Sequence, residues 1–163
     1  MSERPIRLFG DPVLRSPSDP VKLGDPGLAA LVQDLIDTVT LPGRAGVAAC
    51  QIGVGLRAFS YNVDGEIGYV LNPEIVELGG EPELVEEGCL SVPGFYFPRR
   101  RYPFARVEGV DLDGNRVELE GDGLMAQALQ HETDHLDGTL YIMGLDPEIK
   151  RDAMRQIRES DWF

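Results

Sequence analysis

His131 and His135 are the only two histidines among the 163 residues, and they are four positions apart. They enclose an H-E-x-x-H pattern, with Glu132 directly after the first histidine. Residues four apart share one face of a helix, so both imidazoles could bind one divalent ion. Glu132 is expected to point in a neighbouring direction, from which it could reach a water on that ion. The pattern favours a metal-dependent hydrolase over an ordinary amphipathic helix with two solvent-exposed histidines.

A catalytic site of this kind needs a third protein ligand. In the extended metzincin pattern the third histidine would fall on Tyr141, so that pattern is absent. A thermolysin-like site would use a downstream glutamate, for which Glu148 and Glu159 are available. The two cysteines are the remaining candidates. A Cys89 thiolate would complete a Cys-His-His site with one position open for water, whereas Cys50 is expected to be a small buried hydrophobic residue.

Three segments, in this order, resemble the motifs of the peptide deformylase family. They are residues 46–51 (GVAACQ), 87–91 (EGCLS) and 130–135 (QHETDH). The second and third match the family's pattern in full. The first belongs to a longer family pattern, Gly-x-Gly-x-Ala-Ala-x-Gln, and Arg44 stands at the position of its first glycine. Residues 6–15 also look like the family's N-terminal arm. The resemblance therefore covers nearly the whole chain.

The resemblance implies a metal site and a reaction. Cys89, His131 and His135 would bind the metal, and Glu132 would act as general base and later as acid. The implied reaction removes the formyl group from the N-terminal formyl-methionine of newly made polypeptides and releases formate, after attack of a metal-bound water on the formyl carbon. The family prefers Fe²⁺, with Zn²⁺, Ni²⁺ or Co²⁺ as substitutes, and a thiolate ligand suits these ions.

The resemblance also implies the substrate contacts. The Gln51 side chain and the backbone N–H of Leu90 would donate hydrogen bonds to the formyl oxygen, and Gly46 would meet the substrate backbone. The methionine side chain of the substrate would lie against Ala45, Leu124, Gln127 and Ala128. Arg101 could pair with Glu87 beside the cysteine, but a run of three arginines is more often exposed to solvent, and an exposed run is what we expect here.

Two alternatives from other functional classes remain open. A thermolysin-type peptidase would take Glu148 or Glu159 as its third ligand and would cut internal peptide bonds. A non-catalytic metal site would be closed by four ligands, with Cys50 as the fourth, and would not depend on Glu132.

The elements that must position these residues follow from hydrophobic periodicity and turn residues. Helices are predicted over residues 28–40, 123–136 and 147–160, the second of which carries the H-E-x-x-H pattern. Strand-like runs occupy 56–63, 67–71, 74–78, 105–112 and 116–120. Asp64-Gly65 is predicted to turn between the first two runs, and Asn72-Pro73 to separate the next two. The pattern predicts an α+β fold, with antiparallel sheets packed around the central helix, a C-terminal helix, and an N-terminal arm over the surface.

Composition limits the remaining classes. The chain has 15 Lys and Arg against 28 Asp and Glu, a net charge of −13 and a pI near 4.5, so general DNA or membrane-surface binding is not expected. No apolar run approaches the roughly 18 residues of a membrane span, and the N-terminus does not resemble a secretory signal. The length fits a single domain over residues 1–163, and we expect a cytoplasmic protein.

The last predicted helix carries two stripes at helical spacing. Ile149, Ala153 and Ile157 form an apolar stripe, and Arg151, Arg155 and Arg158 form a basic one. Because the family acts on nascent chains, the basic stripe suggests contact with ribosomal RNA phosphates. The alternative is a surface helix with internal salt bridges, since acidic residues interleave the arginines.

Overall fold

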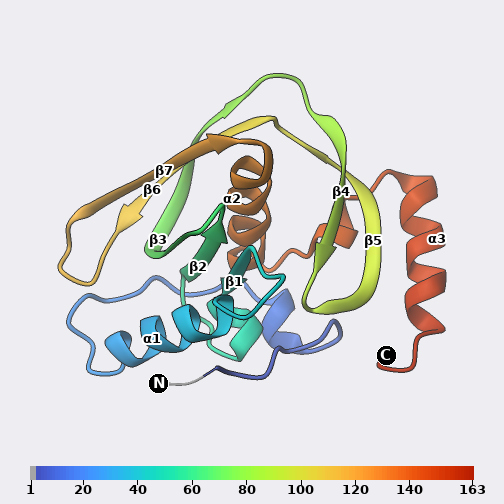
Figure 1. The fold of residues 1–163 in the computed structure, drawn as a ribbon. Coiled ribbons are helices and arrows are strands. Elements are labelled where there is room, and N and C mark those ends of the chain that lie inside the picture. The colour runs from blue at the N-terminus through green and yellow to red at the C-terminus, as the bar shows by residue number, and fades with distance from the viewer. Residues whose placement is uncertain (1–2) are drawn as a thin grey trace.

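The computed structural model describes residues 3–163. It has the predicted α+β architecture, with a five-stranded antiparallel sheet, a separate two-stranded antiparallel sheet and three α-helices (Figure 1). The large sheet, in the order β1-β2-β3-β6-β7, is built from β1 (Gly46–Ala48), β2 (Ala58–Val63), β3 (Glu66–Gly79), β6 (Phe104–Val110) and β7 (Arg116–Asp122). The small sheet pairs β4 (Glu83–Cys89) with β5 (Val92–Arg101). The helices are α1 (Leu28–Val39), α2 (Gly123–Leu136) and α3 (Pro147–Arg158), with 3₁₀ turns η1 (Pro12–Arg15), η2 (Ala49–Ile52) and η3 (Tyr141–Gly144).

The large sheet has a hydrophobic cluster on each face, because successive residues of a strand point to opposite sides. Val47 and Ala58 pack with α1 in one cluster, while their neighbours Ala48 and Phe59 pack with α2 in the other. All four side chains are fully buried. The helix that carries the H-E-x-x-H pattern therefore lies against one face of the sheet, with the β4–β5 hairpin on its other side (Figure 1).

The expectation that Asn72-Pro73 separates two strands is wrong. β3 runs through both residues as one strand of 14 residues, although its register against β6 shifts at this point. Asn72 takes a positive φ of 50°, a conformation that asparagine tolerates better than most residues. Its side chain accepts a hydrogen bond from the Val21 N–H at 2.7 Å and donates to the Val21 carbonyl at 3.0 Å. The N-terminal arm thus stabilises a register shift within one strand, and the strand does not end there.

The β4–β5 hairpin was not predicted from the sequence. Residues 86–93 looked turn-prone because glycine and proline flank the cysteine. In the structure Cys89 ends β4, and a tight turn at Leu90 and Ser91 leads into β5. Periodicity could not show this hairpin, because two of its most buried side chains, Glu87 and Arg101, are charged.

The helix predicted over residues 147–160 is confirmed as α3, which ends at Arg158, and its apolar stripe faces inward. Ala153 and Ile157 are fully buried in the hydrophobic cluster that also packs against α2. Arg151, Arg155 and Arg158 are exposed. No helix described between residues 3 and 163 is long and apolar enough to cross a membrane.

Replacing Ile157 by alanine should lower the free energy of unfolding by about 2–5 kcal/mol, because the change leaves a cavity in a fully buried site. The matched change Arg151→Ala, on the exposed face of the same helix, should stay within about 0.5 kcal/mol of the parent. Urea unfolding of both variants measures the difference. Equal, small effects would mean that α3 does not contribute to the core.

Candidate metal centre and adjoining cavity

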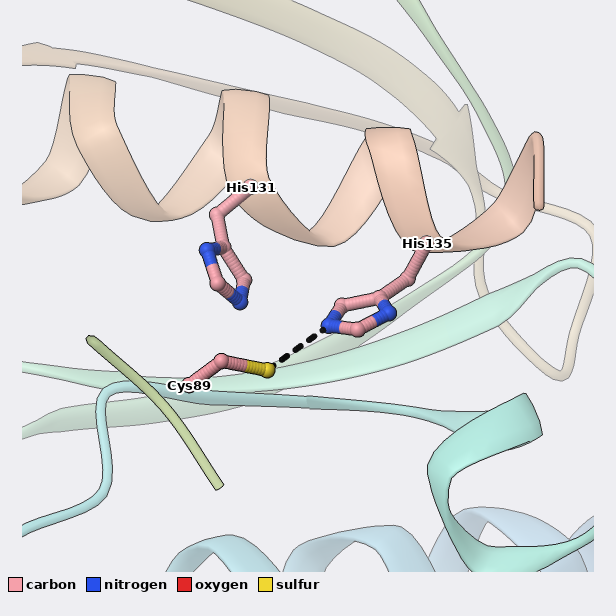
Figure 2. A group of neighbouring side chains, drawn as sticks. All are labelled: Cys89, His131 and His135. Atoms are coloured by element: carbon pink, nitrogen blue, oxygen red, sulfur yellow. Dashed lines mark hydrogen bonds between the residues drawn. The ribbon is translucent and has the colours of Figure 1, made fainter. Parts of the chain in front are cut away.

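Cys89, His131 and His135 place their ligand atoms within 4.8 Å of one another. The histidines come from successive turns of α2, the cysteine comes from the end of β4, and the three side chains point toward a common centre (Figure 2). Cys89 Sγ lies 3.3 Å from His135 Nε2, and the two imidazole centroids are 4.9 Å apart. Among residues 3–163 this is the one group of three or more His, Cys, Asp or Glu side chains placed to hold a metal ion.

A buried carboxylate orients the first histidine. His131 Nδ1 lies 2.7 Å from Glu87 Oε2, and both side chains are largely shielded from solvent. A hydrogen bond at Nδ1 fixes the ring orientation and leaves Nε2 available to bind a metal ion. Figure 2 shows one ring nitrogen of each histidine turned toward the Cys89 sulfur. The sequence motif supplies the two histidines, and the β4–β5 hairpin supplies Glu87, which orients His131.

Glu87 is in turn held by Arg101, which donates from Nε and Nη2 at 2.8 and 2.6 Å. Arg101 Nη1 also donates to Asp134 Oδ2 at 2.7 Å, on α2 between the two histidines. Burial opposes ionisation of Glu87, but the hydrogen bonds from Arg101 and His131 prevail and lower its pKa to about 2. The expectation of a solvent-exposed arginine run is therefore wrong for Arg101, which is 5% exposed. A buried cation needs an anion, and β4 provides one.

Glu132 lies beside the ligand group and is 3% exposed. Its Oε1 is buried with no hydrogen-bond partner among the described residues, and burial raises the pKa of the carboxyl group to about 7. A Cβ on Gly46 would lie only 2.6 Å from Glu132 Oε2. Glycine is therefore required at position 46 for Glu132 to occupy this place.

Hydrogen bonds hold the side chain of Gln51, a residue of η2, in a fixed orientation beside the end of β4. Its Oε1 accepts a hydrogen bond from the Ala48 N–H at 3.0 Å, and its Nε2 donates to Ser91 Oγ at 3.2 Å. The same Nε2 lies 3.7 Å from Cys89 Sγ. The amide N–H₂ is thus turned toward the turn that contains Leu90 and away from η2.

A cavity of about 440 Å³ adjoins these groups. Of the residues expected from the sequence, its lining includes Ala45, Gly46, Gln51, Cys89, Leu90, Leu124, Gln127, Ala128, His131 and Glu132. Gln127 is compatible with an apolar cavity because its Nε2 donates to the Glu86 carbonyl at 3.0 Å and lies 3.3 Å from Glu87 Oε1. Two aromatic lining residues, Phe95 and Tyr96, were not expected, and Tyr96 is 68% exposed. They follow Val-Pro-Gly in the unpredicted hairpin, so no periodic signal indicated them.

The other candidate ligands lie outside this group. Glu148 and Glu159 belong to α3 and its C-terminal cap, on the far side of β5 (Figure 1). Cys50 is fully buried, as expected, and its thiol donates to the His135 carbonyl at 3.5 Å. Burial raises the pKa of this thiol to about 12, so it stays protonated and does not act as a thiolate ligand.

The donor set fits a transition-metal ion. One thiolate and two imidazoles suit iron or zinc better than calcium or magnesium, which prefer oxygen. Burial lowers the pKa of His135 well below its usual value, which keeps the ring in the neutral form that binds metals. With these three residues as ligands, a bound ion would keep a coordination position for a water or a substrate atom. Such an arrangement is typical of a catalytic site and not of a structural one.

Comparison with known proteins gives one consistent result. The family model for polypeptide deformylase matches residues 3–151. A peptide deformylase of Acidothermus cellulolyticus is 51% identical over 99% of this chain and 89% of its own length. One from Mycolicibacterium paratuberculosis is 45% identical, covering 99% and 91%. The crystal structure of a peptide deformylase from Legionella pneumophila superposes with a TM-score of 0.88 at 38% identity, covering 97% of this chain and 95% of the other.

Replacing Arg101 by methionine should lower the free energy of unfolding by about 3–5 kcal/mol, because the change leaves the Glu87 carboxylate buried without its cation. Arg100→Met is the matched control, since Arg100 pairs with Asp146 near the surface and should lose less than about 1 kcal/mol. Urea unfolding distinguishes the two. Similar losses for both variants would show that the buried ion pair contributes no more to the free energy of unfolding than the exposed one.

Proposed function

Because the chain belongs to the polypeptide deformylase family, we propose that Cys89, His131 and His135 bind its metal ion and that Glu132 is its general base. The chain is a metal-dependent hydrolase that removes the N-formyl group from newly made polypeptides. The observation that carries the proposal is the convergence of three ligand atoms within 4.8 Å beside a buried carboxylate with an unpartnered oxygen. We further propose that residues 1–163 act as one catalytic domain.

We propose Fe²⁺ as the metal, with Zn²⁺, Ni²⁺ or Co²⁺ as functional substitutes. The bound ion lowers the pKa of a water and polarises the formyl carbonyl. The thiolate of Cys89 supports this choice because sulfur ligands favour the softer divalent ions. Glu87 supports metal binding at this site in general, since its hydrogen bond to His131 raises the basicity of that imidazole.

Glu132 moves the proton of the reaction. It accepts a proton from the attacking water at its free Oε1 and returns that proton to the leaving amine. A pKa raised to about 7 by burial suits both steps, because neither the acid nor the base form is strongly favoured near neutral pH. General acid–base catalysis of this kind contributes roughly 10²–10⁴ to the rate.

Gln51 and Leu90 stabilise the developing oxyanion. Gln51 Nε2 and the Leu90 N–H donate to the formyl oxygen as negative charge accumulates on it. The hydrogen bond from Ala48 to Gln51 supports this role, because it fixes the amide before the substrate arrives. Donors that need no reorientation are the most effective in such sites.

The cavity lining orients the substrate. β1 is an edge strand of the large sheet, so Gly46 can hydrogen-bond the backbone of an extended formyl peptide. The methionine side chain of the substrate then lies against Ala45, Leu124, Gln127 and Ala128. The hydrogen bonds of the Gln127 amide to β4 leave its methylene groups available for this apolar contact.

Basic residues around α3 contact ribosomal RNA in this proposal. Arg155 is paired with Asp152 and lies 3.9 Å from Glu159, so its charge is largely neutralised. Lys150, Arg151 and Arg158 instead line a surface groove, and none of the described residues that line it is acidic. The others are apolar: Met143, Leu145, Pro147 and Met154. A basic groove in a chain of net charge −13 supports a phosphate contact in the cytoplasm, where nascent chains leave the ribosome.

Replacing Cys89 by alanine should remove most of the bound metal, because one of three ligands is lost. The control Cys50→Ala should keep the metal, since the Cys50 thiol lies outside the ligand group. Metal analysis after anaerobic purification in the presence of iron measures both. Full metal content in Cys89→Ala would exclude the thiolate ligand.

Replacing Glu132 by alanine should keep the metal and lower kcat on formyl-Met-Ala-Ser by about 10²–10⁴ or more. Gln51→Ala should lower kcat by about 10²–10³ with a smaller change in KM, because its hydrogen bond strengthens in the transition state. Amine release and metal content are measured on the same samples. If Glu132→Ala retained its activity, the general-base assignment would be wrong.

The double change Arg151→Glu and Arg158→Glu should weaken ribosome co-sedimentation at low salt while hydrolysis of a short formyl peptide stays within about twofold. Arg155→Glu is the control, since this arginine is already paired with acidic neighbours. Point changes are needed because deleting α3 would also remove the buried Ile157. Unchanged sedimentation of the double variant would reject the RNA contact.

A further inference from the structure

The turn after Cys89 is poorly supported by its own hairpin. Cys89 pairs with Val92, whereas the preceding Gly88 pairs with Tyr96, so residues 93–95 have no partner in β4. These three residues form a bulge in β5, and Gly94 within it takes a positive φ of 85°. Backbone groups that a ladder leaves unpaired need partners from elsewhere in the fold. The position of this turn is therefore set by other segments.

The N-terminal arm provides one support. The Arg7 N–H donates to the Gln51 carbonyl at 2.7 Å, and the Phe9 N–H donates to the Ser91 carbonyl at 2.8 Å. Alternate residues of an extended segment face the same side, so two neighbouring N–H groups can reach two different loops. The arm thereby joins the loop of Gln51 to the turn of Leu90.

The segment after α3 provides a second support on the bulge itself. The Trp162 indole Nε1–H donates to the Pro93 carbonyl at 3.0 Å, and its ring packs against the hydrophobic cluster under α2. The next residue, Phe163, stacks on Phe9 of the arm with ring centroids 5.9 Å apart. Two segments that are more than 150 positions apart thus meet over the turn, as their proximity in Figure 1 indicates.

We propose that Trp162 and the arm residues Arg7 and Phe9 are positioning residues for the Leu90 N–H. A side-chain donor can adjust by rotation, but a backbone N–H moves only with its turn. Oxyanion donors act over a narrow range of distance, near 2.7–3.1 Å. A small shift of the turn therefore reduces the stabilisation of the transition state more than it reduces substrate binding. This inference rests on the proposed role of Leu90 as an oxyanion donor.

The test compares Trp162→Phe with Phe163→Leu. Trp162→Phe keeps an aromatic ring in the cluster and removes the N–H that bonds Pro93. We expect kcat on formyl-Met-Ala-Ser, per bound metal, to fall about 5- to 20-fold with KM unchanged within twofold. We also expect hydrogen exchange of the backbone amides of residues 89–95 to become at least about tenfold faster, while that of α2 is unchanged.

Phe163→Leu is the matched control, because it removes a ring of the stack and keeps both hydrogen bonds to the turn. It should leave kcat and the exchange of residues 89–95 within about twofold of the parent. Unchanged exchange in Trp162→Phe would overturn the inference, and so would an equal loss of kcat in both variants. Faster exchange with unchanged kcat would also overturn it, by showing that the turn moves without consequence. Absence of deformylase activity in the parent would instead be a failure of the proposed function.

Discussion

The buried ion pair between Glu87 and Arg101 is the interaction on which the site depends. It joins the β4–β5 hairpin to α2, because Glu87 also binds His131 and Arg101 also binds Asp134. Removing two charges from water costs several kcal/mol each, and only close, multiple hydrogen bonds offset that cost. Here all the contacts are between 2.6 and 2.8 Å. The same pair therefore orders the hairpin that carries Cys89 and aims the imidazole opposite it.

Close packing adds a second constraint on the same centre. Glu132 fits beside β1 only because Gly46 has no side chain, and the absence of a side chain also leaves an edge-strand backbone open to a peptide. One glycine would thus serve both the proposed proton-transfer group and the proposed substrate contact. Burial of Glu132 follows from this packing, and burial raises its pKa toward neutrality. Steric fit and acid strength therefore have a common origin in this part of the site.

The sequence predicted the parts of the molecule whose signals are local. The H-E-x-x-H spacing, the helical stripes of α1 and α3, and the turn at Asp64-Gly65 all depend on neighbouring residues. The β4–β5 hairpin depends on Glu87 meeting Arg101 across 14 positions, and neither residue looks like core in isolation. Tyr96 was missed because it belongs to the same unpredicted hairpin. Without the family resemblance, Cys89 could not have been chosen over Glu148, because only the fold separates α3 from the histidines.

Arg44 shows how a departure from the family's motif can be accommodated. It lines the cavity where the family's pattern has a glycine, and its Nη1 donates to the Thr38 carbonyl at 3.0 Å, in the last turn of α1. A cation is favourable there because the last carbonyls of a helix have no partners within the helix and carry partial negative charge. Ala45, the next residue, accepts a hydrogen bond from the Asn62 N–H at 2.8 Å, in β2. Hydrogen bonds thus attach this part of the cavity lining to both a helix and a strand, although the glycine of the family's pattern is absent.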